Sequence, residues 1–111
     1  MSKSISDAVE YLYVHGQRYA QAKGELTYLE EFRKSKKALL MKTAMTNGAK
    51  SAAQAEMEAY ADVEYIELLK GLKAAVEAAE GLRWGLVAAQ ARIDVWRSQE
   101  ASNRKMDKAT L

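Results

Sequence analysis

The sequence predicts an all-α protein: a long antiparallel helical hairpin with a short intervening helix and coiled-coil-like packing, assembling into an oligomer. The 111 residues include no proline, the residue that most strongly breaks helices. Between Tyr65 and Trp96, apolar residues recur at spacings that alternate between three and four, as in a helix that packs against other helices. The clearest turn is residues 46–50, where Asn47-Gly48 favours left-handed backbone and a helix C-cap.

The first helix is predicted over about residues 7–45. Ser6 and Asp7 are good N-cap candidates, and Glu10 is placed to close a capping box with Asp7. Apolar or small residues then continue at helical spacing up to the turn, and they are Val9, Leu12, Gly16, Tyr19, Ala22, Leu26, Leu29 and Phe32. This spacing predicts one long helix with a single packed side.

After the turn, the sequence predicts a short helix and then a long one. Ser51 and Gln54 form a capping-box pattern before a short helix over about 52–60. Asp62 is the expected N-cap of a long helix over about 62–106. An unbroken helix from Ser51 onward is the alternative that the sequence leaves open. In either case residues 1–111 are expected to form one helical domain.

The long helix carries an apolar seam, which we define by its ten positions: Tyr65, Leu68, Leu72, Ala75, Ala79, Leu82, Leu86, Ala89, Ile93 and Trp96. Its larger residues are the expected core or oligomer contacts, and they are Leu68, Leu72, Leu82, Leu86, Ile93 and Trp96. A second set of apolar residues flanks the seam: Leu69, Val76, Trp84, Val87, Ala91 and Val95. A two-helix hairpin has no closed core to cover that flank, so we expect another copy or another protein to cover it.

The composition argues against the commonest kinds of catalytic and metal sites. The chain has no cysteine and one histidine, His15, so it lacks a cysteine-ligated zinc site and the partners of a catalytic triad. No glycine-rich phosphate loop is present. We therefore expect no enzyme activity, no metal and no cofactor. No apolar run is long enough for a membrane span, and the polar N-terminal residues do not look like a secretion signal.

Charge is segregated along the chain although the net charge is only +2. A basic run without acidic residues consists of Arg33, Lys34, Lys36, Lys37 and Lys42. An acidic segment follows between Glu56 and Glu80. The basic run could bind phosphates without sequence preference. Alternatively, because the hairpin is antiparallel, its lysines could pair with Glu64 and Glu67.

The order of these features resembles a known family. A long helix with Lys-Lys-Ala-Leu-Leu-Met-Lys at 36–42, an Asn-Gly turn, an acidic segment and a helix with Arg-Trp-Gly-Leu-Val at 83–87 resembles the UvsY-type recombination mediators of tailed phages. Residues 92–100 also resemble small proteins of phage recombination gene clusters. Lys42 matches the basic element of that family, whereas Thr43 and Ala44 stand where it has an arginine.

The resemblance implies a ring-forming helical protein that binds single-stranded DNA. Its contacts would be the five residues of the basic run, and its protein partners a recombinase or annealing protein and a single-strand-binding protein. A cytoplasmic location in a bacterial host cell follows if the protein is phage-encoded. The competing hypothesis is a structural or adaptor coiled-coil protein, such as a virion, chaperone or secretion component, without nucleic-acid binding.

Overall fold

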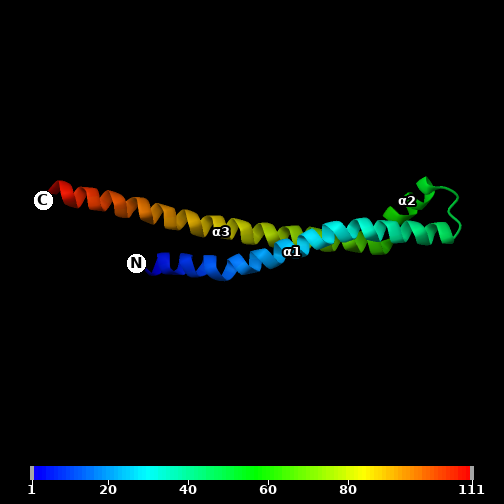
Figure 1. Ribbon diagram of the computed structural model, residues 1–111, viewed down its shortest axis with the longest axis horizontal. Helices are drawn as coiled ribbons and strands as arrows, with labels where there is room; N and C mark the ends of the chain where they lie inside the picture. The colour runs from blue at the N-terminus through cyan, green and yellow to red at the C-terminus, as the bar shows by residue number, and fades with distance from the viewer. Residues whose placement is uncertain (1, 111) are drawn as a thin grey trace. The chain divides into compact units, whose positions relative to one another are not determined.

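The computed structural model describes residues 2–110 and contains three helices in that range, with no strand. They are α1 (Lys3–Thr46), α2 (Ala52–Ala61) and α3 (Val63–Thr110) (Figure 1). The predicted all-α hairpin with a short intervening helix is confirmed. Both long helices have apolar residues at every third or fourth position, which is the spacing of a helix that packs along one side.

Helix α1 begins at Lys3 and not near Asp7, so the predicted N-cap at Ser6 or Asp7 is wrong. Ser2 takes that role, because its hydroxyl accepts a hydrogen bond from the Ile5 amide at 3.3 Å and its carbonyl accepts one from the Ser6 amide at 3.0 Å. A serine hydroxyl at this place satisfies an amide that the helix leaves without a carbonyl partner. At the other end of the chain, α3 continues to Thr110, beyond the expected end near residue 106.

The Asn-Gly turn ends α1 as expected. Gly48 has a φ of +107°, and among residues 2–110 no residue other than glycine has a positive φ. The Gly48 amide donates to the Met45 carbonyl at 3.2 Å, and the Ala49 amide donates to the Ala44 carbonyl at 2.9 Å. These bonds satisfy carbonyls that the last helical turn would otherwise leave free.

Helices α2 and α3 are separate, so the alternative of one unbroken helix from Ser51 is wrong. Asp62 adopts an extended backbone, with φ −67° and ψ 138°. Its carboxylate accepts a hydrogen bond from the Glu64 amide at 2.8 Å, which is the N-capping arrangement expected there. At the start of α2 the Ser51 hydroxyl accepts from the Gln54 amide at 3.1 Å.

The chain divides into two compact units. The terminal unit contains the described residues up to Ala20 and those from Glu80 onward. The central unit contains Gln21–Ala79, and therefore the rest of α1, all of α2 and the start of α3.

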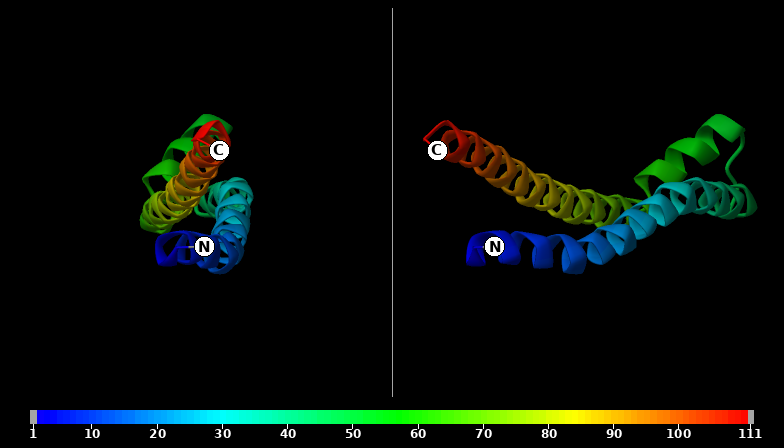
Figure 2. Two further views of the ribbon diagram at one scale, coloured as in Figure 1. Left: turned by 90° about the vertical axis from the view of Figure 1, so that its left-hand side faces the viewer. Right: turned by 60° about the vertical axis from the view of Figure 1, so that its left-hand side comes forward.

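The core of the central unit lies where α2 meets α1 and the start of α3 (Figure 2). Leu40, Ala59 and Tyr65 form a buried cluster, with Met41 packed against it. Ala55 and Ala59 of α2 are almost fully buried. Because alanine has the smallest side chain of the good helix formers, it lets the short helix pack closely on its neighbours.

In the terminal unit, the first part of α1 and the last part of α3 run in opposite directions side by side (Figure 1). Ile5, Ala8 and Ala89 are its buried apolar residues. Val9 was expected on the packed side of α1, but 45% of its surface is exposed. Ile5 and Ala8 lie on that side instead, because they continue the three- and four-residue spacing from the half-buried Leu12 toward the start of α1.

Candidate functional site

The basic run lies on α1 in the central unit, and its five members do not share one face. At about 100° per residue, Arg33, Lys36 and Lys37 fall on the side of α1 that carries the buried Leu40 and are themselves partly buried. Lys34 and Lys42 fall on other sides and are exposed. The run is therefore split between a packed side and a solvent-facing side.

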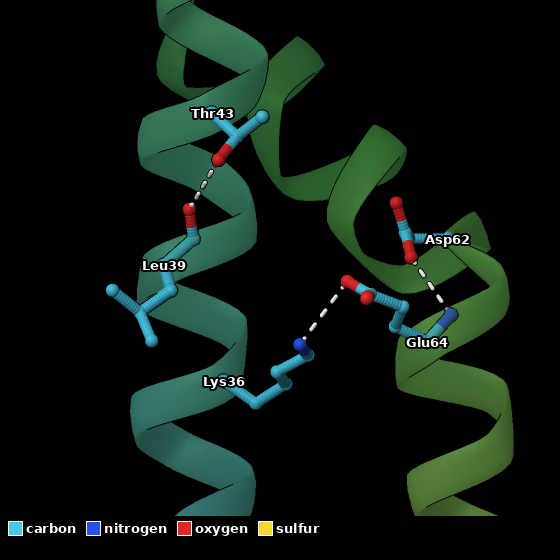
Figure 3. Close-up of polar contacts among 5 residues, drawn as sticks. All are labelled: Lys36, Leu39, Thr43, Asp62 and Glu64. Atoms are coloured by element: carbon cyan, nitrogen blue, oxygen red, sulfur yellow. Dashed lines mark hydrogen bonds and ion pairs between the residues drawn. The ribbon is translucent and has the colours of Figure 1, made fainter.

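Lys36 points from α1 across to the first turn of α3 (Figure 3). Its Nζ lies 3.1 Å from a carboxylate oxygen of Glu64. The side chain of Lys36 retains 23% of its exposure and that of Glu64 retains 63%. Asp62 holds the Glu64 amide, so the helix cap and the ion pair act on the same residue. From the sequence, pairing with Glu64 was the alternative to phosphate binding by the basic run, and for Lys36 this alternative is the one observed.

Lys37 contacts α2. Its Nζ lies 3.6 Å from a carboxylate oxygen of Glu56 and 4.6 Å from the centre of the Tyr60 ring. A hydrogen bond with Tyr60 and the charge of Glu56 raise the pKa of Lys37 above its ordinary value of 10.5, against an opposing effect of desolvation. The Tyr60 ring in turn packs edge-on against the Tyr65 ring, with the ring centres 5.3 Å apart. The Lys37 ammonium therefore lies over one ring of an aromatic pair.

Glu56 belongs to the acidic segment that the sequence predicts beside the basic run, whereas nothing in the sequence indicates Tyr60 as a partner of Lys37. The expected partner Glu67 instead lies 3.2 Å from Lys70, one turn along α3. The acidic character of α2 was the available signal. What the sequence does not show is that α2 turns back so that Glu56 and Tyr60 face Lys37.

The remaining basic residues have different surroundings. Lys34 pairs with Glu31 at 3.3 Å, and both side chains are about two-thirds exposed. Arg33 is half-buried, and neither Arg33 nor Lys42 makes an ion pair with another described residue. Lys42 and Lys34 are thus the members of the run most accessible to a ligand in solution.

The apolar seam of α3 faces the other helices of each unit. In the central unit Tyr65 and Ala79 are buried, and Leu68 and Leu72 are half-buried. In the terminal unit Ala89 is buried, whereas Leu82, Leu86, Ile93 and Trp96 are half-buried. No large side chain among the described residues is fully buried. The seam therefore contacts α1 while leaving part of each leucine open to solvent.

A shallow groove of about 320 Å³ opens between α1 and α3 in the terminal unit. Its lining combines small residues with one acid and one base: Asp7, Tyr11, Gly85, Ala88, Ala89 and Arg92. The Tyr11 side chain lies directly against Gly85, where a Cβ would overlap the tyrosine hydroxyl. Tyr11 also stacks on His15, with ring centres 3.9 Å apart. The one histidine of the chain is thus engaged in packing within α1.

Two classes of site are not found among residues 2–110. No group of three or more His, Cys, Asp or Glu side chains in this range is arranged to hold a metal ion. No helix in the range combines the length and hydropathy needed to span a membrane. The chain matches no protein-family model, no curated protein and no solved structure in the comparisons with known proteins.

Proposed function

We propose that the protein is a non-catalytic helical adaptor that works as an assembly of several copies. The observation that supports this proposal most strongly is the distribution of its apolar residues. No large side chain is fully buried within the described chain, whereas Trp84, Val95 and Val63 are more than half exposed. Exposed apolar surface of this kind costs free energy in water, and covering it drives association between proteins.

The ion pairs of the central unit fit this role. Lys36 with Glu64, and Lys37 with Glu56 and Tyr60, join α1 to α3 and α2. These contacts give two members of the basic run a structural task within one chain. They support the adaptor hypothesis over the hypothesis that the whole run contacts nucleic acid.

A second candidate is the recombination accessory role, in which the protein binds single-stranded DNA and helps a recombinase or annealing protein to load. The exposure of Lys34 and Lys42 favours it, because both ammonium groups are accessible to phosphates. Arg33 would be the third contact. Repetition of this small patch around an oligomer would strengthen weak binding by each copy.

The first measurement is the mass of the full chain in solution, by light scattering at micromolar concentration. The adaptor proposal expects a mass several times that of one chain, and melting that depends on protein concentration. A monomer that melts cooperatively at the same temperature at all concentrations would overturn it.

A fluorescent single-stranded oligonucleotide then separates the two candidates. The adaptor proposal expects no binding at about 50 mM salt, where phosphate contacts are strong. The DNA candidate expects binding that weakens with salt, with a log–log slope of about −0.7 per phosphate neutralised. In that case Lys34→Glu with Lys42→Glu abolishes binding with little change in the melting temperature, whereas Lys36→Glu with Lys37→Glu abolishes it and lowers that temperature more.

A further inference from the structure

In the terminal unit, α3 has a second apolar face opposite the seam. At about 100° per residue, Trp84, Ala88, Ala91 and Val95 fall within about 60° of arc, and Leu86 and Ile93 of the seam lie roughly 180° away. We call these four residues the outer stripe. Trp84 is 59% exposed and Val95 is 56% exposed, and Ala88 and Ala91 are also exposed. One helix therefore has two apolar faces, of which α1 covers one.

We propose that a second copy of this chain covers the outer stripe, with the two α3 helices antiparallel. This inference rests on the proposed function, which requires self-assembly, and it adds the face, the direction and the register. Ala88 lies level with Ala91 of the second copy, and Trp84 lies level with its Val95. The two alanines allow the helix axes to approach closely, and a large residue closes each end of the contact.

The charges beside the outer stripe support the antiparallel direction. Glu80 and Arg83 form an ion pair at 3.0 Å, and Asp94 and Arg97 form one at 3.9 Å. Arg83 and Asp94 both lie roughly 100° from the centre of the stripe, on the side where Val87 also lies, whereas Arg97 lies close to the seam.

When one copy of the helix is reversed, Arg83 comes opposite Asp94 of the other copy. In the antiparallel register the two residues are within two residues, about 3 Å along the axis, of the same level, and they lie on the same edge of the contact. By symmetry, Asp94 lies equally near the second copy's Arg83, and opposite charges placed in this way favour association. In a parallel pairing in register, Arg83 and Asp94 of the two copies would lie on opposite edges of the contact and could not pair.

The Trp84 ring is already held in position within one chain, which favours such a contact. The Arg83 guanidinium lies 4.5 Å from the centre of its ring, and a cation over an aromatic face holds both groups in place. Tryptophan and arginine are the residues that most often dominate the binding energy of an interface. The pair would thus contribute at both ends of the symmetric contact.

Disulfide trapping tests the direction and the register, because the chain contains no cysteine. In the proposed register Gly81 lies within one residue of the level of Gln99 in the second copy, and both lie about 50° from the centre of the stripe on the same edge of the contact. A Cβ at Gly81 meets no atom within 4 Å, and Gln99 is exposed, so neither substitution disturbs one chain. We expect a mixture of Gly81→Cys and Gln99→Cys chains to give a mixed disulfide dimer under mild oxidation.

Val95→Cys alone should give little disulfide, because antiparallel pairing holds the two residues roughly 16 Å apart along the axis. Efficient disulfide formation by Val95→Cys alone would show a parallel pairing, in which the two residues face each other, and would overturn the inference. As a control on another side of α3, Gln90→Cys mixed with Gly81→Cys should remain reduced.

Ala91→Glu provides the second test, because it places a charge in the middle of the outer stripe and keeps helix propensity close to that of alanine. We expect it to lower the assembly mass, whereas Ala74→Glu, at an exposed position of α3 in the central unit, leaves the mass unchanged. An assembly that keeps its mass with Ala91→Glu overturns the outer stripe as its interface but leaves the adaptor proposal standing. A wild-type monomer overturns both.

Discussion

The Nζ of Lys37 lies 4.6 Å from the centre of the Tyr60 ring and 3.6 Å from a carboxylate oxygen of Glu56. One lysine of α1 thus binds both an aromatic ring and an acid of α2. The contact adds to the burial of Ala55 and Ala59 in holding the short helix against its neighbours. It also makes Lys37 the member of the basic run with the largest structural role.

The stabilising effect of Lys37 should depend on pH. Its pKa is raised in the folded chain above the ordinary value of 10.5, first by Tyr60 and then by Glu56. A raised pKa means that its contribution is complete below pH 10.5 and is lost as the pH rises through the folded-state value. We expect Lys37→Met to melt at a lower temperature than wild type at pH 7, with a gap that narrows above pH 10.5. Lys70→Met serves as the control, because Lys70 pairs within one helix. A gap that stays constant with pH would contradict the role assigned to the ammonium group.

The pair between Lys36 and Glu64 should make a small but measurable contribution to stability. The Glu64 side chain is 63% exposed, and exposed ion pairs contribute about 0–1 kcal/mol. In a double-mutant cycle with Lys36→Met and Glu64→Gln, measured by urea unfolding, we expect a coupling energy within that range. The matched cycle for Lys34 and Glu31, which are neighbours on one helix, should give about 0.5 kcal/mol or less. If the two cycles gave equal values, α1 and α3 would gain nothing from this pair beyond an ordinary surface contact.

The free energy of unfolding lost on truncating Leu86 distinguishes packing within one chain from packing in an assembly. It is half-buried in one chain, so Leu86→Ala should cost less than the roughly 2–5 kcal/mol of a fully buried leucine if α1 alone covers it. Unfolding free energies from urea titration at two protein concentrations measure the cost. A loss near the top of the range would show that a further chain covers the seam as well. Leu39→Ala, at a position that is 56% exposed, gives the baseline for a leucine with little packing.

Gly85 should tolerate alanine less well than another helical glycine does. The Tyr11 hydroxyl occupies the place of a Cβ at Gly85, whereas nothing lies within 4 Å of one at Gly71. Gly71→Ala should therefore stabilise the protein by roughly 0.5–1 kcal/mol through helix propensity. Gly85→Ala gains the same propensity but has to displace the tyrosine ring, so its melting temperature should be lower than that of Gly71→Ala. Equal shifts would show that Tyr11 moves away without cost, and Tyr11→Phe combined with Gly85→Ala should recover part of the difference.

The local chemistry of the sequence was sufficient to predict the three helices and the junctions between them. A chain without proline, an apolar spacing of three and four from Tyr65 to Trp96, and the Asn47-Gly48 turn predicted the hairpin. Ser51 and Asp62 predicted the starts of α2 and α3, because a cap depends only on residues within one turn. The cap at Ser2 was missed because Asp7 and Glu10 offered a stronger pattern a few residues later.

Contacts between residues distant in the sequence were decided only by tertiary structure. The sequence left two roles open for the basic run, binding phosphates or pairing with acids, and in the structure Lys36 and Lys37 lie beside α3 and α2 while Lys34 and Lys42 face solvent. Tyr60 had no sequence signal as a partner of Lys37, because that contact depends on the direction in which α2 turns back. The sequence by itself determined which residues form helices and which side of each helix is apolar, since both depend on neighbours within one or two turns. Which charges meet, and which apolar face is left uncovered, depended on how the helices pack, because those pairings join residues far apart in the chain.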